Sequence, residues 1–344
     1  MTPTSGEAPL TYKSSGVDLD AAIDVKSHIA DLVSASHGPG VLEGIGSFGA
    51  MYQLGEYREP ILVSSTDGVG TKLKIASMIG RFDTIGKDLV NLCVNDIIVT
   101  GARPLFFLDY IAVSSLKPNL VEDIVKGMVE ACKAVGCALI GGETAQMPGV
   151  YDDGELDLAG FVVGALEKNS IKDLSRIKES DLLVGIPSSG LHTNGYSLVR
   201  HALQIDDNPS ILEEYFEEID GPLGDALLVP HRSYYNTLAP LFSVFKAAAH
   251  ITGGGLPENI PRVLTKDLSA RIDTTTWDRP PIMPLIQNMG NISLEEMYRV
   301  FNMGLGMVLV CEPSAADEAI KEISGACIIG EIIKTEEGKR VSLI

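Results

Sequence analysis

The sequence is poor in tryptophan, in paired cysteines and in positive charge. It holds one Trp and five Cys in 344 residues, and no two Cys form a C-x-x-C pair. An odd number of isolated thiols argues against a disulfide framework or a zinc site, so we interpret these residues as buried free thiols. Lys and Arg total 27 against 46 Asp and Glu, a formal net charge of −19. This balance argues against sequence-independent nucleic-acid binding and against attraction to an anionic membrane surface.

Long apolar runs are also missing. No stretch approaches the ~20 apolar residues of a membrane span. The polar start from Met1 to Pro9 has no apolar core of the signal-peptide type. We therefore expect a cytoplasmic protein with neither membrane nor nucleic acid as a partner. The chain is also longer than the ~250–300 residues at which a single core usually stops growing, so we expect two domains.

Hydrophobic periodicity indicates that both halves of the chain are α/β. In the first half the expected strands are 61–63, 105–113, 138–140 and 158–166, and the expected helices are 21–34, 84–100 and 121–135. In the second half the expected strands are 182–187, 306–310 and 328–333, and the expected helices are 197–203, 238–249, 294–301 and 313–324. We divide the chain into a partly mobile arm (1–20), an N-terminal domain (21–167) and a C-terminal domain (168–344).

The first motif with chemical content follows the strand at 61–63. It reads Ser65-Thr66-Asp67-Gly68-Val69-Gly70-Thr71-Lys72. The two glycines allow backbone N–H groups to approach phosphate oxygens, and Lys72 would add positive charge. Asp67 could hold Mg²⁺, which prefers carboxylate and phosphate oxygens. The spacing is not that of a P-loop, and the motif alone fits a tight turn with a surface lysine equally well.

Three further acidic residues occur in apolar surroundings. Asp96 lies in the apolar helix at 84–100, Asp109 interrupts the strand at 105–113, and Glu143 follows Gly141-Gly142 after the strand at 138–140. Charges in such places must be paired or bound to a metal, and ligands bind at the carboxyl ends of strands in open α/β sheets. Each acid alone could be a helix cap or an ion-pair partner. As a set with Asp67 they favour a magnesium–nucleotide site.

Within this set, Asp67, Asp96 and Glu143 are the expected metal ligands. Asp109 is a candidate catalytic residue, and Lys72 is a candidate phosphate-binding and catalytic residue.

Two glycine-rich loops in the second half are candidate anion sites. The first combines glycines, hydroxyls and an amide before a helix, a pattern that suits an anion; its candidate residues are Gly190, His192, Thr193, Asn194, Gly195 and Ser197. His192 could be a general acid or base near neutral pH, or a hydrogen-bonding residue of the loop. The second loop follows His250, which we interpret as structural; its candidate residues are Thr252, Gly253, Gly254 and Gly255.

Several segments together resemble one enzyme family. They include STDGVGTKLKIA, NDIIVTGARPLFFLDY, GGETAQMPGVY, SSGLHTNGYSLVR, ITGGGLPENIPRVL and MYRVFNMGLGM. They look like aminoimidazole ribonucleotide synthetase, also called phosphoribosylformylglycinamidine cyclo-ligase. The likeness runs in order from about residue 11 to the last strand. Asp96, Gly101 and Ala102 fall within a match to the D-x4-G-A-x-P nucleotide signature of that family.

This resemblance implies an ATP-dependent ligase of de novo purine biosynthesis. It would convert formylglycinamidine ribonucleotide to aminoimidazole ribonucleotide, with ADP and phosphate as the other products. ATP and Mg²⁺ would bind at the loop 65–72, at Asp96 with Gly101 and Ala102, and at Glu143. The ribonucleotide would bind at the loops Gly190–Ser197 and Thr252–Gly255. The resemblance also implies a homodimer in which N-terminal strands of both subunits form a shared barrel, with the C-terminal domains outside.

Other enzymes of the same architecture are competing interpretations. A thiamine-monophosphate kinase or a hydrogenase-maturation dehydratase would share the layout. The maturation enzyme would need a C-terminal Cys, whereas this sequence ends in Leu343-Ile344. Selenophosphate synthetase would need a reactive Cys or selenocysteine near the start, whereas the first Cys is Cys93, and the related amidotransferase is far longer. A non-catalytic nucleotide-binding regulator would not need the paired acids.

Overall fold

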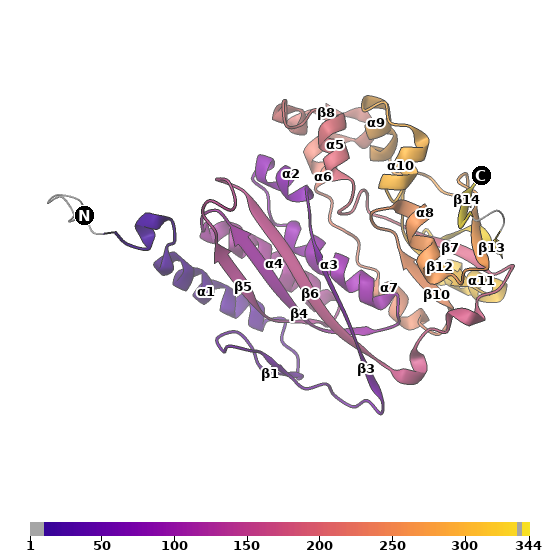
Figure 1. Ribbon diagram of the computed structural model, residues 1–344, viewed down its shortest axis with the longest axis horizontal. Coiled ribbons are helices and arrows are strands. Elements are labelled where there is room, and N and C mark those ends of the chain that lie inside the picture. Colours follow the sequence, from indigo (N-terminus) through magenta and orange to yellow (C-terminus); the bar gives the residue numbers. More distant parts are fainter. Residues whose placement is uncertain (1–9, 336–338) are drawn as a thin grey trace.

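The computed structural model describes residues 10–335 and 339–344. Two large sheets, each with its own helices, lie side by side (Figure 1). The first nine residues of the expected arm lie outside the described residues. The rest of the arm contains a 3₁₀ turn (Lys13–Ser15) and the start of α1 (Leu19–Ser34). Among the described helices, none has both the length and the apolar character needed to cross a membrane.

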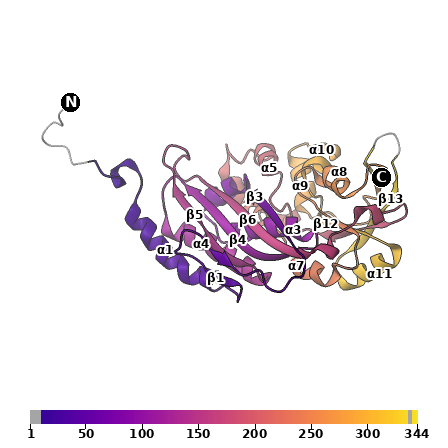
Figure 2. The same ribbon diagram turned by 60° about the horizontal axis from the view of Figure 1, so that its bottom comes forward.

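The N-terminal sheet has the order β3-β6-β4-β5. Its strands are β3 (Pro60–Gly68), β6 (Leu156–Glu167), β4 (Arg103–Val113) and β5 (Ala138–Gln146). Strands β4 and β5 are parallel and joined through α4 (Pro118–Ala134), whereas the other pairs are antiparallel. Helices α3 (Ile85–Ile98) and α4 pack against one face of the sheet, and α1 packs on α4 and β5 (Figure 2).

On the opposite face of this sheet, called the open face below, the ring of Tyr52 packs against Phe106 with the centroids 5.3 Å apart, whereas Leu62, Tyr110 and Phe161 are exposed.

Helices α3 and α4 approach each other closely at two glycines. A Cβ added to Gly86 would lie 1.9 Å from the backbone oxygen of Ile124, and one added to Gly127 would lie 2.9 Å from that of Asp83. Only a residue without a side chain fits between two helix backbones at this separation. The close contact holds α3, which carries several residues of the site, in a fixed place on the sheet.

The C-terminal sheet has six strands in the order β10-β12-β7-β13-β11-β14. They are β10 (Ala247–His250), β12 (Leu305–Cys311), β7 (Leu182–Pro187), β13 (Cys327–Lys334), β11 (Leu268–Ile272) and β14 (Val341–Leu343). Only β11 and β14 pair in parallel. Every residue of β12 is buried, so this strand is covered on both faces and shows no alternation.

Short helices and ribbons complete the fold. In the first half they are β1 (Val41–Glu43), β2 (Met51–Tyr52) and α2 (Lys72–Ile79). In the second half they are α5 (Tyr196–Ala202), β8 (Tyr215–Phe216), β9 (Gly221–Pro222), α6 (Leu223–Leu227), α7 (Tyr235–Leu238), α8 (Gly255–Asn259), α9 (Ile282–Met289), α10 (Leu294–Val300) and α11 (Pro313–Glu322). The expected mixed α/β class is confirmed.

Two expectations about these elements are wrong. The expected helix 238–249 is the short helix α7, a 3₁₀ turn (Ala239–Leu241) and then strand β10. Alanines favour helices, but Ala247–Ala249 are buried and pair with β12. The pairing with β12, rather than helix propensity, therefore determines the conformation of this segment. In addition, β3 and β5 run several residues further than expected, so Asp67 and Glu143 lie within strands rather than after them.

Candidate active site

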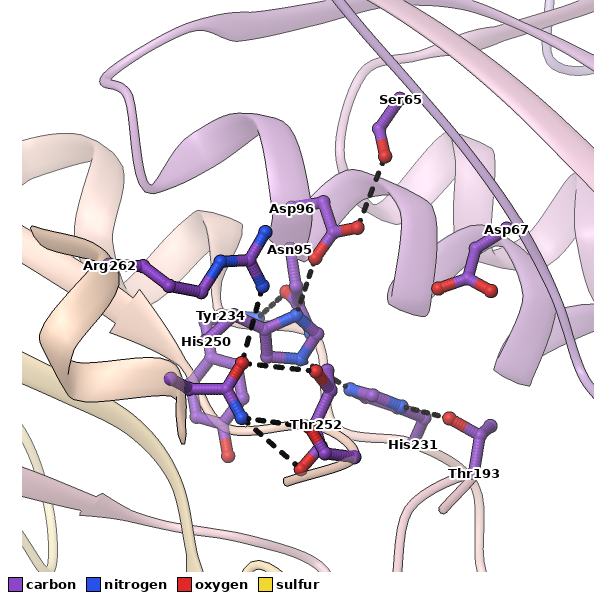
Figure 3. Close-up of polar contacts among 12 residues, drawn as sticks. Ser65, Asp67, Asn95, Asp96, Thr193, His231, Tyr234, His250, Thr252 and Arg262 are labelled. Atoms are coloured by element: carbon purple, nitrogen blue, oxygen red, sulfur yellow. Dashed lines mark hydrogen bonds and ion pairs between the residues drawn. The ribbon is translucent and has the colours of Figure 1, made fainter. Parts of the chain in front are cut away.

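Some of the candidate residues from the two units meet along the boundary between the two sheets, which we call the seam (Figure 3). Ser65 of β3 donates a hydrogen bond to Asp96 of α3, at 3.1 Å. The other Asp96 oxygen lies 2.9 Å from Nδ1 of His250, at the end of β10. The hydroxyls of Thr71 and Ser197 are 3.1 Å apart. The loop after β3 therefore faces the first turn of α5 across the seam.

Asp67 and Asp96 are two carboxylates that lack a Lys or Arg partner in the part of the chain that the structure describes. Among the described residues, neither forms an ion pair with Lys or Arg, and Asp96 pairs only with His250. Burial is the main cause that raises the pKa of Asp67, and the negative charge of Asp96 raises it further. The N–H of Gly68, 2.7 Å from Asp67 Oδ1, opposes this rise. Neighbouring carboxylates that lack a counter-charge are a donor set that suits Mg²⁺.

Lys72 is not available to a phosphate. Its side chain is fully buried, and its Nζ lies 2.9 Å and 2.8 Å from the two carboxylate oxygens of Asp88. It also donates to the backbone oxygen of Val229, at 2.7 Å. The expected role of Lys72 in phosphate binding and catalysis is therefore wrong for this conformation, because the ammonium points into the protein at the first turn of α2. Its partners make it a link between the two units.

Two other expected nucleotide contacts, Gly101 and Ala102, lie far from Asp67. They immediately precede Arg103, which pairs with Ala165, whereas Asp67 pairs with Gly160 of the same strand. Five residues along β6 correspond to about 16 Å. Gly101 has a φ of +88° and follows α3 as a left-handed terminating residue. The structure thus gives Gly101 a role in ending the helix and places both residues away from Asp67.

Glu143 faces away from the two aspartates. In the sheet register, Asp67, Gly160 and Asp109 are neighbours, whereas Glu143 pairs with Tyr110. Because side chains alternate along a strand, Asp109 shares the helix-covered face with Asp67, and Glu143 points to the open face. The structure therefore does not bring Glu143 to the expected metal site. Burial, with a smaller contribution from Glu143, raises the pKa of Asp109 to about 7.

The loop before α5 has the form of an anion cradle. Gly190 and Gly195 have φ angles of +144° and +82°, and His192, at +61°, also has the left-handed conformation. In the described part of the chain, the N–H groups of residues 190–195 donate to no other group. Successive free N–H groups in a tight turn form a concave site for anions.

His192 itself is not poised for proton transfer. It is 1% exposed, and burial lowers its pKa well below the ordinary value, so the ring is neutral near pH 7. Its Nε2 accepts the N–H of Ser189 at 3.2 Å, which places the ring proton on Nδ1. These contacts favour the second interpretation of His192, as a residue that shapes the loop.

The second glycine-rich loop lies directly beside the first. A Cβ added to Gly253 would lie 3.4 Å from Oδ1 of Asn194. Asn259 supports the turn from behind, because its Nδ2 donates to the backbone oxygens of Gly253 and Gly255 at 3.1 Å and 2.9 Å. Asn302 supports the first loop in the same way, with a 2.8 Å bond to the oxygen of Gly190. The sequence analysis missed both asparagines, because nothing local distinguishes them.

Two family models together match most of the chain. Residues 49–166 match the model of the AIR synthase related protein, N-terminal domain, and residues 178–342 match that of its C-terminal domain. A relative from Thermoanaerobacter pseudethanolicus, named phosphoribosylformylglycinamidine cyclo-ligase, is 48% identical over 96% of this chain and 99% of its own. The chain belongs to the AIR synthase related family. A relative of the same name from Carboxydothermus hydrogenoformans is 50% identical over 95% of this chain and 97% of its own.

Solved structures share the fold at much lower identity. A thiamine-monophosphate kinase from Stenotrophomonas maltophilia has a TM-score of 0.64 at 15% identity, covering 92% of this chain and 95% of its own. The hydrogenase maturation protein HypE in complex with ATP has a TM-score of 0.65 at 17% identity, covering 92% of this chain and 90% of its own. These similarities show the fold and carry nothing about the reaction.

Proposed function

We propose that the protein is an ATP-dependent cyclo-ligase that converts formylglycinamidine ribonucleotide to aminoimidazole ribonucleotide. The observation that carries this proposal is the near-complete match to relatives named for this reaction. The seam geometry supports it, because one side offers carboxylates for a metal–nucleotide and the other offers free backbone N–H groups for an anion. The distant kinases and maturation proteins share only the fold.

The reaction needs two events that the seam can place together. The formyl oxygen attacks the terminal phosphorus of ATP and ADP leaves; an amidine-side nitrogen then attacks the formyl carbon and phosphate leaves with that oxygen. Holding these groups in line can provide much of the rate of ring closure. A bound Mg²⁺ would neutralise charge on the phosphates, and Asp67 and Asp96 are the residues that would hold it.

The chain's own residues have separate parts in this scheme. The turn from Gly68 to Thr71 would receive the nucleotide phosphates, as expected from its two glycines. The loops Gly190–Ser197 and Thr252–Gly255 would orient the ribonucleotide through backbone N–H groups. Thr71 and Ser197, in contact across the seam, would bring the two ligands together and limit the access of water.

The direct test is to incubate the purified protein with ATP, Mg²⁺ and formylglycinamidine ribonucleotide. We expect equal amounts of ADP and aminoimidazole ribonucleotide. A parallel reaction with thiamine monophosphate in place of the ribonucleotide tests the kinase alternative. Phosphate transfer to thiamine monophosphate, or the absence of both expected products, would overturn the proposal.

We further propose that the protein is a homodimer formed through the open face of the N-terminal sheet. Leu62, Tyr110 and Phe161 lie on this face and are 62%, 38% and 40% exposed. Large exposed apolar side chains gathered on one face often mark an interface. Replacement of Leu62 by Glu should shift the sedimentation coefficient to that of a monomer, whereas Leu294→Glu, on the exposed surface of α10, should not. A wild-type protein that sediments as a monomer would exclude the dimer.

A further inference from the structure

A line of four hydrogen-bonded side chains crosses the seam (Figure 3). It starts at Asp96 on α3 and continues to Nδ1 of His250, at 2.9 Å. Nε2 of His250 lies 3.0 Å from Nε2 of His231, and Nδ1 of His231 lies 3.3 Å from the hydroxyl of Thr193. The line therefore joins a proposed metal ligand in one unit to the proposed substrate loop in the other.

His231 occupies the middle of this line and is held from several sides. It lies between α6 and α7, where its N–H donates to Asp88 at 2.7 Å and its backbone oxygen accepts from Asn91 at 2.7 Å. The ring is 1% exposed and stacks on His192, with the centroids 3.9 Å apart and the planes at 21°. Both the position and the plane of the ring are therefore fixed.

The hydrogen-bonding chemistry of the four groups determines which nitrogen of each histidine ring carries the proton. The Asp96 carboxylate only accepts, so His250 carries its proton on Nδ1. Nε2–H of His231 then donates to Nε2 of His250, and Nδ1 of His231 accepts from the hydroxyl of Thr193. Burial lowers the pKa of His231 well below its ordinary value, in agreement with a neutral ring. A single pattern of donors and acceptors then satisfies every contact.

The three histidines could instead be read as a metal site. Ligand atoms of His192, His231 and His250 lie within 4.8 Å of one another. The lone pair of an imidazole nitrogen lies in the plane of its ring, however, and two nearly parallel stacked rings direct their lone pairs side by side rather than toward one point. The distance of 3.0 Å between His231 and His250 is that of a hydrogen bond. The arrangement favours a hydrogen-bonded line without a metal.

We propose that His231 is a positioning residue that orients His250 and, through it, the Asp96 carboxylate. The contact of His231 with Thr193 makes this orientation depend on the position of the substrate loop. This inference rests on the proposed cyclo-ligase function and adds a residue to its site. Loss of a group that orients a metal ligand typically costs about 10–100-fold in metal affinity or activity. A movement of Thr193 in the substrate loop would then alter the orientation of Asp96 through His231 and His250, in addition to any contact between the two ligands themselves.

The test compares three substitutions of His231. Phe preserves the ring and its stacking on His192 but removes both hydrogen bonds. Gln extends far enough to restore the contact with His250, whereas Asn can reach only Thr193. His201→Phe is the matched control, because His201 is exposed on α5. Two properties are measured for each protein: the Mg²⁺ concentration that half-saturates ATP binding by calorimetry, and kcat and KM for the ribonucleotide.

In His231→Phe we expect the half-saturating Mg²⁺ concentration to rise and kcat to fall by about 10-fold or more, as for an orienting group, with a smaller change in KM. We expect Gln to recover most of the Mg²⁺ affinity and Asn to recover little. A Phe variant with unchanged Mg²⁺ affinity and kcat, or equal recovery by Gln and Asn, would overturn the proposal. Tight stoichiometric Zn²⁺ binding lost in the Phe variant would overturn it in favour of a metal site. Because ATP binding is measured without turnover, a wild-type protein that binds Mg²⁺–ATP but makes no product would contradict the cyclo-ligase function alone.

Discussion

Replacement of Lys72 by Met should destabilise the protein rather than weaken its binding of ATP. The ammonium and the Asp88 carboxylate are both fully buried and lie 2.8 Å apart. Met has a similar length but removes the charge and the bond to Val229. Asp88 then keeps only the N–H of His231, at 2.7 Å. Removing one partner of a buried ion pair costs about 3–5 kcal/mol, because the other charge stays behind in the interior.

A double variant separates the cost of the unpaired charge from the cost of packing. In Lys72→Met/Asp88→Asn the remaining group is neutral, and its amide oxygen can still accept from His231. We expect this variant to recover more than half of the loss. Lys74→Met is the control, because Lys74 pairs with Glu155 on the surface, where an ion pair contributes about 0–1 kcal/mol.

The assay is urea unfolding at several pH values, combined with the KM for ATP. In the single variant, burial raises the pKa of Asp88 and no cation opposes it. A carboxyl whose folded pKa lies above its unfolded pKa favours the folded state at low pH, and this contribution is lost as the pH rises through the folded pKa. The destabilisation should therefore be smaller at pH 5 than at pH 8. A variant of near wild-type stability with a raised KM for ATP would refute this reasoning and return Lys72 to the phosphate site.

Three further outcomes follow from single contacts. Asp67→Asn should lower kcat at least 10-fold with little change in the thermal unfolding midpoint, because among the described residues its side chain makes one hydrogen bond, to the N–H of Gly68; a loss of folding would contradict its metal role. Gly306→Ala should lower the free energy of unfolding by about 1–3 kcal/mol through overpacking, because its Cβ would lie 2.0 Å from Tyr234 Oη and 2.5 Å from His192 Cε1. Urea unfolding measures this change, and an unchanged midpoint would contradict it. Asp109 has a pKa raised to about 7, so its stabilising contribution should decline as the pH rises from about 4 to 7, and Asp109→Asn should flatten the pH dependence of the urea midpoint relative to wild type.

The sequence predicted the α/β class well because its strands and helices are strongly periodic. The expected strand 182–187 is β7 to the residue, and the expected helix 121–135 is α4, which begins three residues earlier, at Pro118. Strand ends were less predictable. The polar residues after Val63 continue β3, because the ladder with β6 extends to Gly68, and no local property of those residues shows this pairing.

The candidate site was predictable in its loops but not in its contacts. The glycine patterns identified the turns near Gly68, Gly190 and Gly253. The pairing of Asp96 with His250 joins residues 154 positions apart, and only the packing of the two units creates it. The same packing directs the Lys72 side chain into the interior, where it contacts Asp88 and Val229. Its sequence neighbours fit a phosphate loop, and the partner that captures it, Asp88, looks like an ordinary helix residue.

Polar side chains of α3 make hydrogen bonds across the seam between the two units. These bonds explain why the site depends on how the two units are placed relative to each other. Asp88, Asn91 and Asn95 are spaced three and four residues apart, so they share one face of the helix. All three bond to the backbone of residues 231–234. Such bonds are directional, and a buried group left unpaired costs about 1–3 kcal/mol. They therefore fix the segment in one register on α3, which apolar contacts alone would not do. His231 belongs to that segment, so the register on α3 decides whether its ring reaches His250 and completes the line to Asp96.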